Sequence, residues 1–571
     1  MFKKIAIFAA VLLMSVGFTS CNLDYFPDDE LNADLLLSDE AGAEYIMDGC
    51  YATLKDEVEF LGYASGNTYV RHYTQLAEFP GDNISLAGKT TDPLYDAMAY
   101  MMTDGLKNVG TMWWLAYKVI YMSNTVIESA KEGESSKKDQ LIGEAYYMRA
   151  LMHLHMVTMY AKQYTFGRDN AGVPLRITTA SDVTTRASVG EVYDQIVKDL
   201  RKAGELMTPT SARGNKGYPS HDAAIALLTR VHLYMEDYDA VLADYAEVLN
   251  GAAPTSKLDP NIGTYFANAK TSVETLFCIA HEVTDDKAQS SAGSMYNGDG
   301  GGWGEIYPSN PLLYLYERYP EDKRYADLIA PQYNDLQSGY FILIPDPATP
   351  DNASGRQNLK YPAVPVGEVT FQGATAVAEK FTFNAEGKSY EVKKKVVNGE
   401  YFEYYVEFGG ETLQVRVTKP MFDRYNYYRY YVKKLGYQDG SPTLCSPVMQ
   451  RWGEVILNAA EAYAKKGQDD EALKLVNIIR TRAGIPAEGL FAADKMHGYT
   501  SVLDVVLDER RLELAFEGHR PIDVYRNKQQ MDRRYPGAQP WGVVNYDYDH
   551  ILYPIPYSEW SVSGIAQNPG Y

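Results

Sequence analysis

Two blocks of helical periodicity, separated by a long stretch that lacks it, restrict most strongly what this chain can fold into. In residues 39–250, and again from 451 to about 516, apolar residues recur at spacings of three and four, as in amphipathic helices. Helices are predicted at 113–130, 138–161, 189–207 and 221–249, and Ser188 with Glu191 has the spacing of a capping box. The fold is therefore predicted to be mainly α-helical.

The second block contains a helix pair with the residue pattern of a tetratricopeptide repeat. Small and large residues stand where two helices must approach closely and fill a groove, at Ala460, Tyr463, Gly467, Ala472 and Val476. The pair predicted at 221–249 has the same outline but lacks several of the small residues. We expect a tetratricopeptide-like scaffold of helix pairs joined by short turns.

Between the helical blocks, residues 252–446 have the composition of long surface loops, rich in Gly, Pro, Asn, Asp and aromatic residues. Within them, 378–418 alternates as strands do, with Asn398-Gly399 and Gly409-Gly410 as turn signals, which predicts a small β-meander insertion. Because binding residues concentrate on loops that a rigid scaffold positions, we expect the ligand-binding region at 252–446, on a loop-rich irregular face.

The N-terminal residues predict export and a lipid anchor. Lys3 and Lys4 precede an apolar run at 5–18, which is too short to span a membrane but suits the core of a signal peptide. The run leads into Thr19-Ser20-Cys21, which resembles a bacterial lipobox. We expect 1–20 to be removed and Cys21 to carry fatty acyl chains. The alternative is an ordinary secreted protein with an unmodified Cys21.

The net charge excludes one class of partner. The chain has 54 Lys and Arg residues against 75 Asp and Glu residues, a formal net charge of −21. Such a surface repels phosphate backbones, so nucleic-acid binding is not expected. The cysteines after Cys21 are Cys50, Cys278 and Cys445, which show neither disulfide nor zinc-site spacing and are expected to be buried as small hydrophobic residues.

Motifs in both helical blocks and at the C-terminus resemble those of one family. They are GEAYYMRAL at 143–151, GVPL at 172–175, WGEVILNAAEA at 452–462, N-x-x-R-x-R-A-G at 477–484, ERRLELAFEGHR at 509–520, PIP at 554–556 with Glu559, and QNPGY at 567–571. Together with the lipobox, they resemble the SusD/RagB-like outer-membrane lipoproteins over almost the whole mature length. The insertion at 378–418 is larger than the family minimum.

The resemblance implies a single SusD-like domain at 39–571, with its helical scaffold at 39–250 and 450–520, that binds glycans and is not an enzyme. Such proteins sit as a lid on a SusC-type TonB-dependent transporter and hand it oligosaccharides. The implied partners are that transporter, a glycan and, through Cys21, the outer membrane; no cofactor is implied. The acidic tether at 21–38 resembles the surface-export signal of Bacteroidetes lipoproteins. The RagB branch of the family leaves a peptide ligand open as an alternative.

Candidate sugar-binding residues were chosen for two properties. Flat apolar faces stack on pyranose rings, and polar side chains hydrogen-bond the hydroxyls. The first candidate is the glycine-rich loop 294–310, where Trp303 is either a stacking platform or a core residue; its residues are Tyr296, Asn297, Asp299, Trp303 and Tyr307. The second candidate is 63–83, expected to be a loop between helices; its residues are Tyr69, Arg71, Tyr73, Asp82 and Asn83.

One acidic segment makes a surface glycoside hydrolase the hypothesis from another class. Glu509, Glu513 and Glu517 share one helical face, and glycosidases use paired carboxylates. Carboxylates on one face point the same way, however, whereas a glycosidase flanks the sugar from two sides. An internal ion-pair network is expected instead, in which Arg510, Arg511 and Arg520 neutralise acids of neighbouring helices. The sequence contains no zincin, P-loop or nucleophile-elbow motif, and Asp299 supports calcium only weakly. No catalytic residue and no metal site are predicted.

Overall fold

The structure is a computed structural model that describes residues 40–571, except 61–62, 66–67, 88–91, 93–94, 181–182, 337–340, 343–349, 352–355, 358–370, 373–374, 377, 386, 399–400, 425–426 and 541. The predicted signal peptide, the acidic tether and Cys21 lie outside the described residues. Within the described part, no helix has the length and apolar character that a membrane crossing requires.

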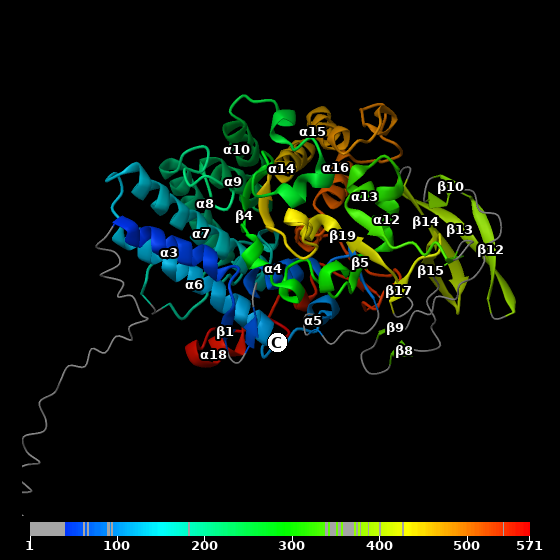
Figure 1. Ribbon diagram of the computed structural model, residues 1–571, viewed down its shortest axis with the longest axis horizontal. Helices are drawn as coiled ribbons and strands as arrows, with labels where there is room; N and C mark the ends of the chain where they lie inside the picture. Colours follow the sequence, from blue (N-terminus) through cyan, green and yellow to red (C-terminus); the bar gives the residue numbers. More distant parts are fainter. Residues whose placement is uncertain are drawn as a thin grey trace, which may run out of the picture.

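Helices form most of the first half of the chain and stack in sequence order (Figure 1). Each helix from α6 to α10 packs against the next one along the chain, and α3 and α4 pack against α6. The mainly α-helical prediction is confirmed. The helices are α3 (Glu40–Thr53), α4 (Thr68–Glu78), α5 (Tyr95–Ala99), α6 (Lys107–Ser129), α7 (Ser136–Tyr160), α8 (Val189–Leu206), α9 (His221–Tyr234) and α10 (Tyr238–Leu249).

The second helical block completes the same scaffold. Helices α9 and α10 contact α14 (Trp452–Lys465), and α14 packs against α15 (Asp469–Arg482) and α16 (Val502–Glu513). One hydrophobic core cluster contains residues of both blocks, such as Leu227 and Ile456. The remaining described helices are shorter: α11 (Ile262–Tyr265), α12 (Asn310–Glu317), α13 (Lys323–Ala326), α17 (Arg520–Arg526) and α18 (Tyr557–Ser563).

Local signals in the sequence explain where several helices begin and turn. At the start of α8, the Ser188 hydroxyl accepts from the Glu191 amide at 3.2 Å, and the Glu191 carboxylate accepts from the Ser188 amide at 2.8 Å, which confirms the capping box. Between α14 and α15, Gly467 has φ +70°, a left-handed value that glycine adopts without strain. Ala460 and Ala472 are fully buried in this helix pair.

The stretch 63–83 differs from the prediction, because its centre is α4 and not a loop. Tyr69, Val70, Leu76 and Ala77 recur at helical spacing and are buried, so α4 is an element of the core. The helix is only eleven residues long and carries several polar residues, so its periodicity extends over only about three turns. The expectation that this stretch is a loop is therefore wrong.

Short antiparallel strand pairs connect the middle region to the helices. Strand β3 (Ile84–Leu86) pairs with β5 (Ile306–Pro308), and β4 (Thr275–Cys278) pairs with β20 (Val448–Arg451). The other pairs are β1 (Val58–Phe60) with β2 (Tyr63–Ser65), β6 (Ile329–Pro331) with β19 (Tyr430–Val432), β7 (Phe341–Ile342) with β16 (Val417–Thr418), β8 (Pro350–Asp351) with β9 (Arg356–Gln357), β10 (Phe371–Gln372) with β11 (Thr375–Ala376), β17 (Asp423–Arg424) with β18 (Tyr427–Tyr428), and β21 (Met531–Asp532) with β22 (Val543–Val544).

The predicted β-meander is present as a four-stranded antiparallel sheet in the order β12 (Lys380–Ala385), β13 (Lys388–Asn398), β14 (Tyr401–Phe408) and β15 (Glu411–Val415). Gly409 and Gly410 form the β14–β15 turn with positive φ, as expected. The sheet is joined to α12, where the Tyr314 hydroxyl donates to the Val415 carbonyl at 2.6 Å. It forms one end of the molecule, opposite the long helices (Figure 1).

The three described cysteines behave as predicted. Cys50, Cys278 and Cys445 are buried, and none of them forms a disulfide with another described cysteine. Burial raises the pKa of each thiol to about 12, so all three remain protonated and chemically inert at neutral pH.

Candidate functional site

The glycine-rich candidate loop 294–310 packs closely against the segment that contains Tyr431. A Cβ atom on Gly302 would overlap the Asn297 carbonyl, and one on Gly298 would overlap the Tyr431 hydroxyl. Gly304 has φ +53° and would crowd the Gly298 backbone. Glycine is required here because the backbone folds back on itself and on Tyr431, which fixes the position of Trp303.

Three of the loop candidates are buried, and their side chains are held by protein contacts. Tyr296 is inaccessible and packs edge-to-face on Phe516, with ring centroids 5.7 Å apart. The Asn297 side chain donates to the Pro442 carbonyl at 3.1 Å and accepts from the Asp299 amide at 3.0 Å. Tyr307 lies on the buried strand β5. In this conformation these side chains support the loop and present no face to solvent.

Trp303 and Asp299 are the loop candidates that reach the surface. The Trp303 side chain is 45% exposed, so its ring combines a buried anchor with an open face. Asp299 is exposed and accepts a hydrogen bond from the Tyr437 hydroxyl at 2.8 Å. A half-exposed indole and an exposed carboxylate on one loop provide the two kinds of contact that a sugar ring needs.

The β17–β18 hairpin adds surface residues that sequence reasoning missed. Arg424 donates to the Trp303 carbonyl and to Glu305, the latter at 2.6 Å. Phe422, two residues earlier, is 48% exposed, and its amide donates to the Gln332 carbonyl. Tyr333 is 37% exposed and pairs with Met421, so its side chain lies on the other face of this strand pair from Phe422. Arg424 thus joins the Trp303 loop to the hairpin face that carries Phe422, and the two exposed aromatic residues Trp303 and Phe422 are here called the aromatic surface. Figure 1 shows β5 and β17 between the helices and the meander.

The backbone beside the aromatic surface adopts conformations that bulky residues rarely take. Tyr437 has φ +65° and Asp439 has φ +50°, both in the left-handed region. The Tyr437 ring is partly exposed, with the Lys433 amino group 5.9 Å from its centroid. Such strained residues are held only where surrounding contacts determine them, and they cluster at functional sites.

The second group of candidates is mostly part of the core. The Tyr69 hydroxyl lies 2.8 Å from His155 Nδ1, and the Tyr73 ring stacks on His155 at a centroid distance of 3.9 Å. Arg71 is partly exposed on α4 and lies beside the buried His72. These residues join α4 to α7 and do not converge on a hollow with Trp303.

Asp82 and Asn83 lie between α4 and β3 and bind arginines of the C-terminal part. Asp82 accepts from Arg520 at 2.7 and 3.0 Å, and Asn83 accepts from Arg511 at 2.8 Å. Although burial acts to raise it, the charges of Arg511 and Arg520 hold the pKa of Asp82 well below its usual range. Both residues are buried and hold the N-terminal and C-terminal segments together.

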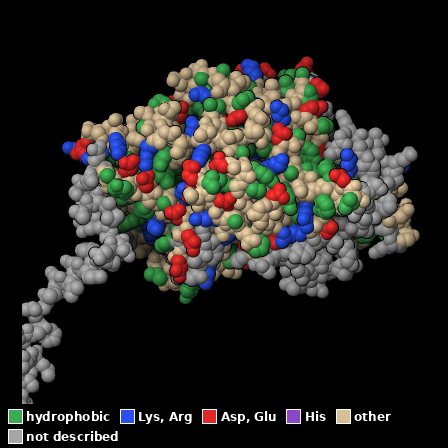
Figure 2. All heavy atoms as spheres, viewed as in Figure 1, with side chains coloured by type: hydrophobic (Ala, Val, Ile, Leu, Met, Phe, Trp, Pro, Cys, Tyr) green, Lys and Arg blue, Asp and Glu red, His purple; other side chains and the backbone are tan. Residues whose placement is uncertain are grey.

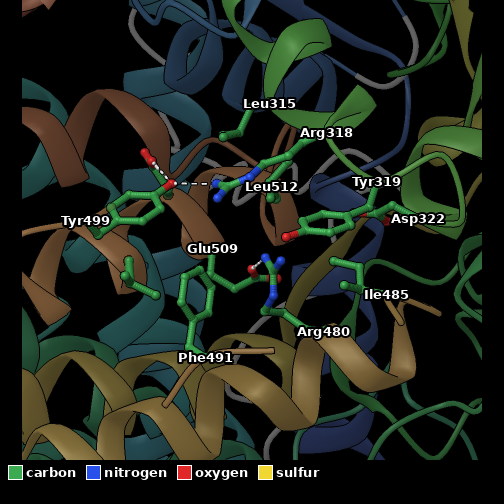
Figure 3. Close-up of a pocket in the computed structure, with 12 residues that line it drawn as sticks. Leu315, Arg318, Tyr319, Asp322, Arg480, Ile485, Phe491, Tyr499, Glu509 and Leu512 are labelled. Atoms are coloured by element: carbon green, nitrogen blue, oxygen red, sulfur yellow. Dashed lines mark hydrogen bonds and ion pairs between the residues drawn. The ribbon is translucent and has the colours of Figure 1, made fainter. Parts of the chain in front are cut away.

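The expected ion-pair network around Glu509 is confirmed. Glu509 is buried and bonds to Arg324 at 2.6 Å and Arg480 at 2.8 Å. Figure 3 shows Arg480 and Glu509 turned toward each other in a cavity that also contains Arg318 and Tyr499. This cavity has a volume of about 10 Å³, enough for about one water molecule and too small for a sugar.

The other two carboxylates of this face are buried in the same way. Glu513 binds Arg451 at 2.6 Å, and Glu517 binds Arg451 at 2.8 Å and Lys434 at 2.6 Å. Although burial acts to raise it, the charges of Arg451 and Lys434 lower the pKa of Glu517 to about 2. The three acids therefore neutralise buried cations and do not flank a sugar-sized space.

Two further observations concern other parts of the surface. A groove of about 760 Å³ lies between α15 and the loop at 255–260, with Lys323, Lys474 and Ile478 among its lining residues. None of the residues that line this groove belongs to the aromatic surface. No group of three or more His, Cys, Asp and Glu side chains in the described residues is arranged to hold a metal ion.

Two family models match the chain. The model described as "SusD family" matches residues 274–571, and the one described as "Starch-binding associating with outer membrane" matches 25–233. Among curated proteins, SusD-like protein P2 of Formosa agariphila is 23% identical, and the alignment covers 100% of both chains. SusD-like protein P38 of the same organism is 22% identical over 97% of this chain and 96% of its own.

Solved structures with the same fold include members of this superfamily. A SusD superfamily protein from Bacteroides thetaiotaomicron superimposes with a TM-score of 0.67 at 20% identity, covering 94% of this chain and 100% of its own. A SusD-like carbohydrate binding protein from Bacteroides vulgatus gives a TM-score of 0.60 at 17% identity, covering 91% and 95%. At these identities the similarity establishes the fold.

Proposed function

Because the chain belongs to the SusD family, we propose that it is a cell-surface lipoprotein that binds oligosaccharides and passes them to a SusC-like TonB-dependent transporter. It binds the glycan without cleaving it. The N-terminal family match, whose description names starch binding and association with the outer membrane, supports glycan binding and a place at the outer membrane. Attachment through acylated Cys21 and exposure outside the cell belong to the same proposal.

The observation that carries the proposal is the aromatic surface around Trp303. Its ring is half exposed on a loop that glycine packing holds in place, and Arg424 joins this loop to the hairpin that carries the exposed Phe422. Stacking on such rings is effective because they are rigid before the ligand arrives and lose little conformational freedom. Asp299 and Tyr437 supply nearby hydrogen-bonding groups for hydroxyls. Affinity would be modest, since sugar hydroxyls exchange water for protein at little net gain.

The test is a binding screen of the protein without residues 1–21 against a panel of polysaccharides by affinity gel electrophoresis. Each polymer that retards the protein is then analysed for breakdown products. Retardation without cleavage is the expected result. Cleavage would replace the proposal with a hydrolase, and no retardation by any polymer would favour a peptide ligand.

Substitutions locate the site once a polymer is found. We expect Trp303→Ala to weaken retardation about tenfold, the loss of one stacking contact of roughly 1.5 kcal/mol. Tyr121→Ala is the matched control, because Tyr121 is 56% exposed on α6, away from the aromatic surface. Equal affinity of Trp303→Ala and the unaltered protein, with intact circular dichroism, would move the site elsewhere.

A further inference from the structure

Cationic side chains lie on the same hairpin face as Phe422, and they indicate what kind of glycan the aromatic surface binds. In the β17–β18 hairpin the Arg429 amide donates to the Phe422 carbonyl, so these two residues are cross-strand partners. Because successive strand residues alternate sides, Phe422, Arg424 and Arg429 lie on one face of the hairpin. Figure 2 shows Lys and Arg side chains gathered near β5 and β17 on the described face.

The two arginines of this face differ in their partners. Arg424 is neutralised by Glu305 and held against the Trp303 carbonyl. Arg429 donates through Nε to the Asp423 carbonyl at 3.0 Å, and none of the described carboxylates lies within ion-pair distance of it. It is only half-buried, so its terminal nitrogens remain available to a ligand.

An unpaired arginine contrasts with the pattern of this chain. Most of the buried arginines of the C-terminal part face carboxylates, as Arg451 does with Glu274 and Glu513. Arg533, which donates to the Met98 carbonyl, is an exception. Two lysines beside the exposed tyrosines also have no ion-pair partner among the described residues: Lys419 lies 5.9 Å from the Tyr333 centroid, and Lys433 lies 5.9 Å from that of Tyr437. The chain has 21 more acidic than basic residues, so carboxylates that could pair with these three cations are abundant in it.

We infer that the aromatic surface binds a glycan that carries anionic groups, with Trp303 stacking on a sugar ring and Arg429 pairing with a carboxylate or sulfate of the same chain. This inference rests on the proposed function. A guanidinium binds either anion through two parallel hydrogen bonds, and these charge-assisted bonds are the strong ones. Arg424, fixed by Glu305, positions the hairpin against the Trp303 loop.

The net negative charge of the whole molecule affects how an anionic glycan can bind. A polyanion is repelled at long range by the net charge, but that field is screened over about 8 Å at physiological salt. Local contacts therefore decide binding, and only a glycan that meets both the ring and the guanidinium gains from them. A neutral glycan would leave Arg429 solvated and gain the stacking contact alone.

The experiment compares polymers that differ only in charge, using affinity gel electrophoresis of the protein without residues 1–21. One pair is polygalacturonate and its methyl ester, and the other is a sulfated galactan and the same galactan after desulfation. The expected result is that at least one charged polymer retards the protein and its neutral counterpart does not, and that retardation falls as salt is raised. Which pair discriminates tells whether the anion is a carboxylate or a sulfate.

Two variants assign the effect to Arg429. Arg429→Gln is expected to weaken binding of the charged polymer about tenfold, the loss of one charge-assisted contact. Arg168→Gln removes the same charge from an exposed arginine in the loop before α8, paired with Asp194, and is expected to leave binding unchanged. Circular dichroism of both variants checks that they are folded.

Each other outcome overturns the inference in a recognisable way. Equal retardation by charged and neutral polymers, or equal effects of the two variants, would refute anion selectivity and leave glycan binding intact. Retardation by neutral polymers alone would do the same. If no polymer of any kind retards the protein, the proposed function itself fails together with the inference.

Discussion

Glu78, at the end of α4, is a buried carboxyl that makes the stability of the protein depend on pH. Its oxygens accept hydrogen bonds from the Gly518 amide at 2.9 Å and from Asn83 at 3.2 Å, and no described Lys or Arg forms an ion pair with it. Burial raises its pKa from 4.5 to about 7. The folded state thus binds the proton more tightly than the unfolded state does.

The sign of the pH effect follows from that shift. The contribution of the protonated Glu78 to the free energy of unfolding is complete below about pH 4.5 and is lost as the pH rises through about 7. Its size is on the order of 3 kcal/mol. Urea denaturation across this range should show that Glu78→Gln removes this part of the pH dependence, whereas exposed Glu205→Gln keeps it. An unchanged pH profile of Glu78→Gln would show that Glu78 is ionised in the fold throughout.

At the residue scale, chemistry was easier to predict from the sequence than exposure. The sequence left open whether Trp303 in the loop 294–310 is a stacking platform or a core residue, and in the structure it is 45% exposed. Tyr296 could not be told apart from it, because the ring that covers Tyr296 belongs to Phe516, more than two hundred residues later. Arg429 and Phe422 were not predicted as binding residues, because they lie in or next to a tyrosine-rich run with no spacing signal for a hairpin.

At the element scale, the Trp303 loop depends on the absence of side chains. Gly302→Ala would force a Cβ atom into the Asn297 carbonyl, so we expect the free energy of unfolding to fall by about 1–3 kcal/mol and glycan affinity to fall with it. Gly105→Ala is the control, because its Cβ would meet no atom within 4 Å. Urea denaturation and affinity gels measure both effects. Similar behaviour of the two variants would show that the loop adapts and does not fix Trp303.

Elements with local signals were the ones that could be predicted. The α8 capping box and the Gly409-Gly410 turn of the meander involve neighbours in sequence, and both are confirmed. Helix α4 was not predicted because its pattern is short and because it packs on α6 and, through Tyr69 and Tyr73, on His155 of α7. The strand pair β3–β5 joins segments more than two hundred residues apart, and no periodicity could reveal it.

At the scale of the whole molecule, the two helical blocks are joined by buried charge as well as by apolar packing. Arg230 on α9 forms a bidentate pair with Glu454 on α14, both bonds 2.5 Å long, and both side chains are almost completely buried. Helices α9 and α10 both pack on α14. Neither block can therefore unfold without exposing the apolar surface and the charges of the other.

This coupling predicts how the pair responds to substitution. Removing one partner, as in Glu454→Met, leaves the other charge buried and alone, so the free energy of unfolding should fall by about 3–5 kcal/mol. Replacing both, as in Arg230→Met with Glu454→Met, should cost much less than the sum of the single changes, because apolar side chains of similar volume need no partner. Urea denaturation of the four proteins measures this difference.

The same curves test whether the blocks unfold together. Tryptophan fluorescence and far-ultraviolet circular dichroism should give one coincident transition in every variant, because the core is shared. If the double substitution lowered the free energy of unfolding by as much as the two single substitutions together, the two charges would be solvated separately. Two separate transitions would mean that residues 40–250 and 450–520 are independent folding units, and that the charge pair only touches across a boundary between them.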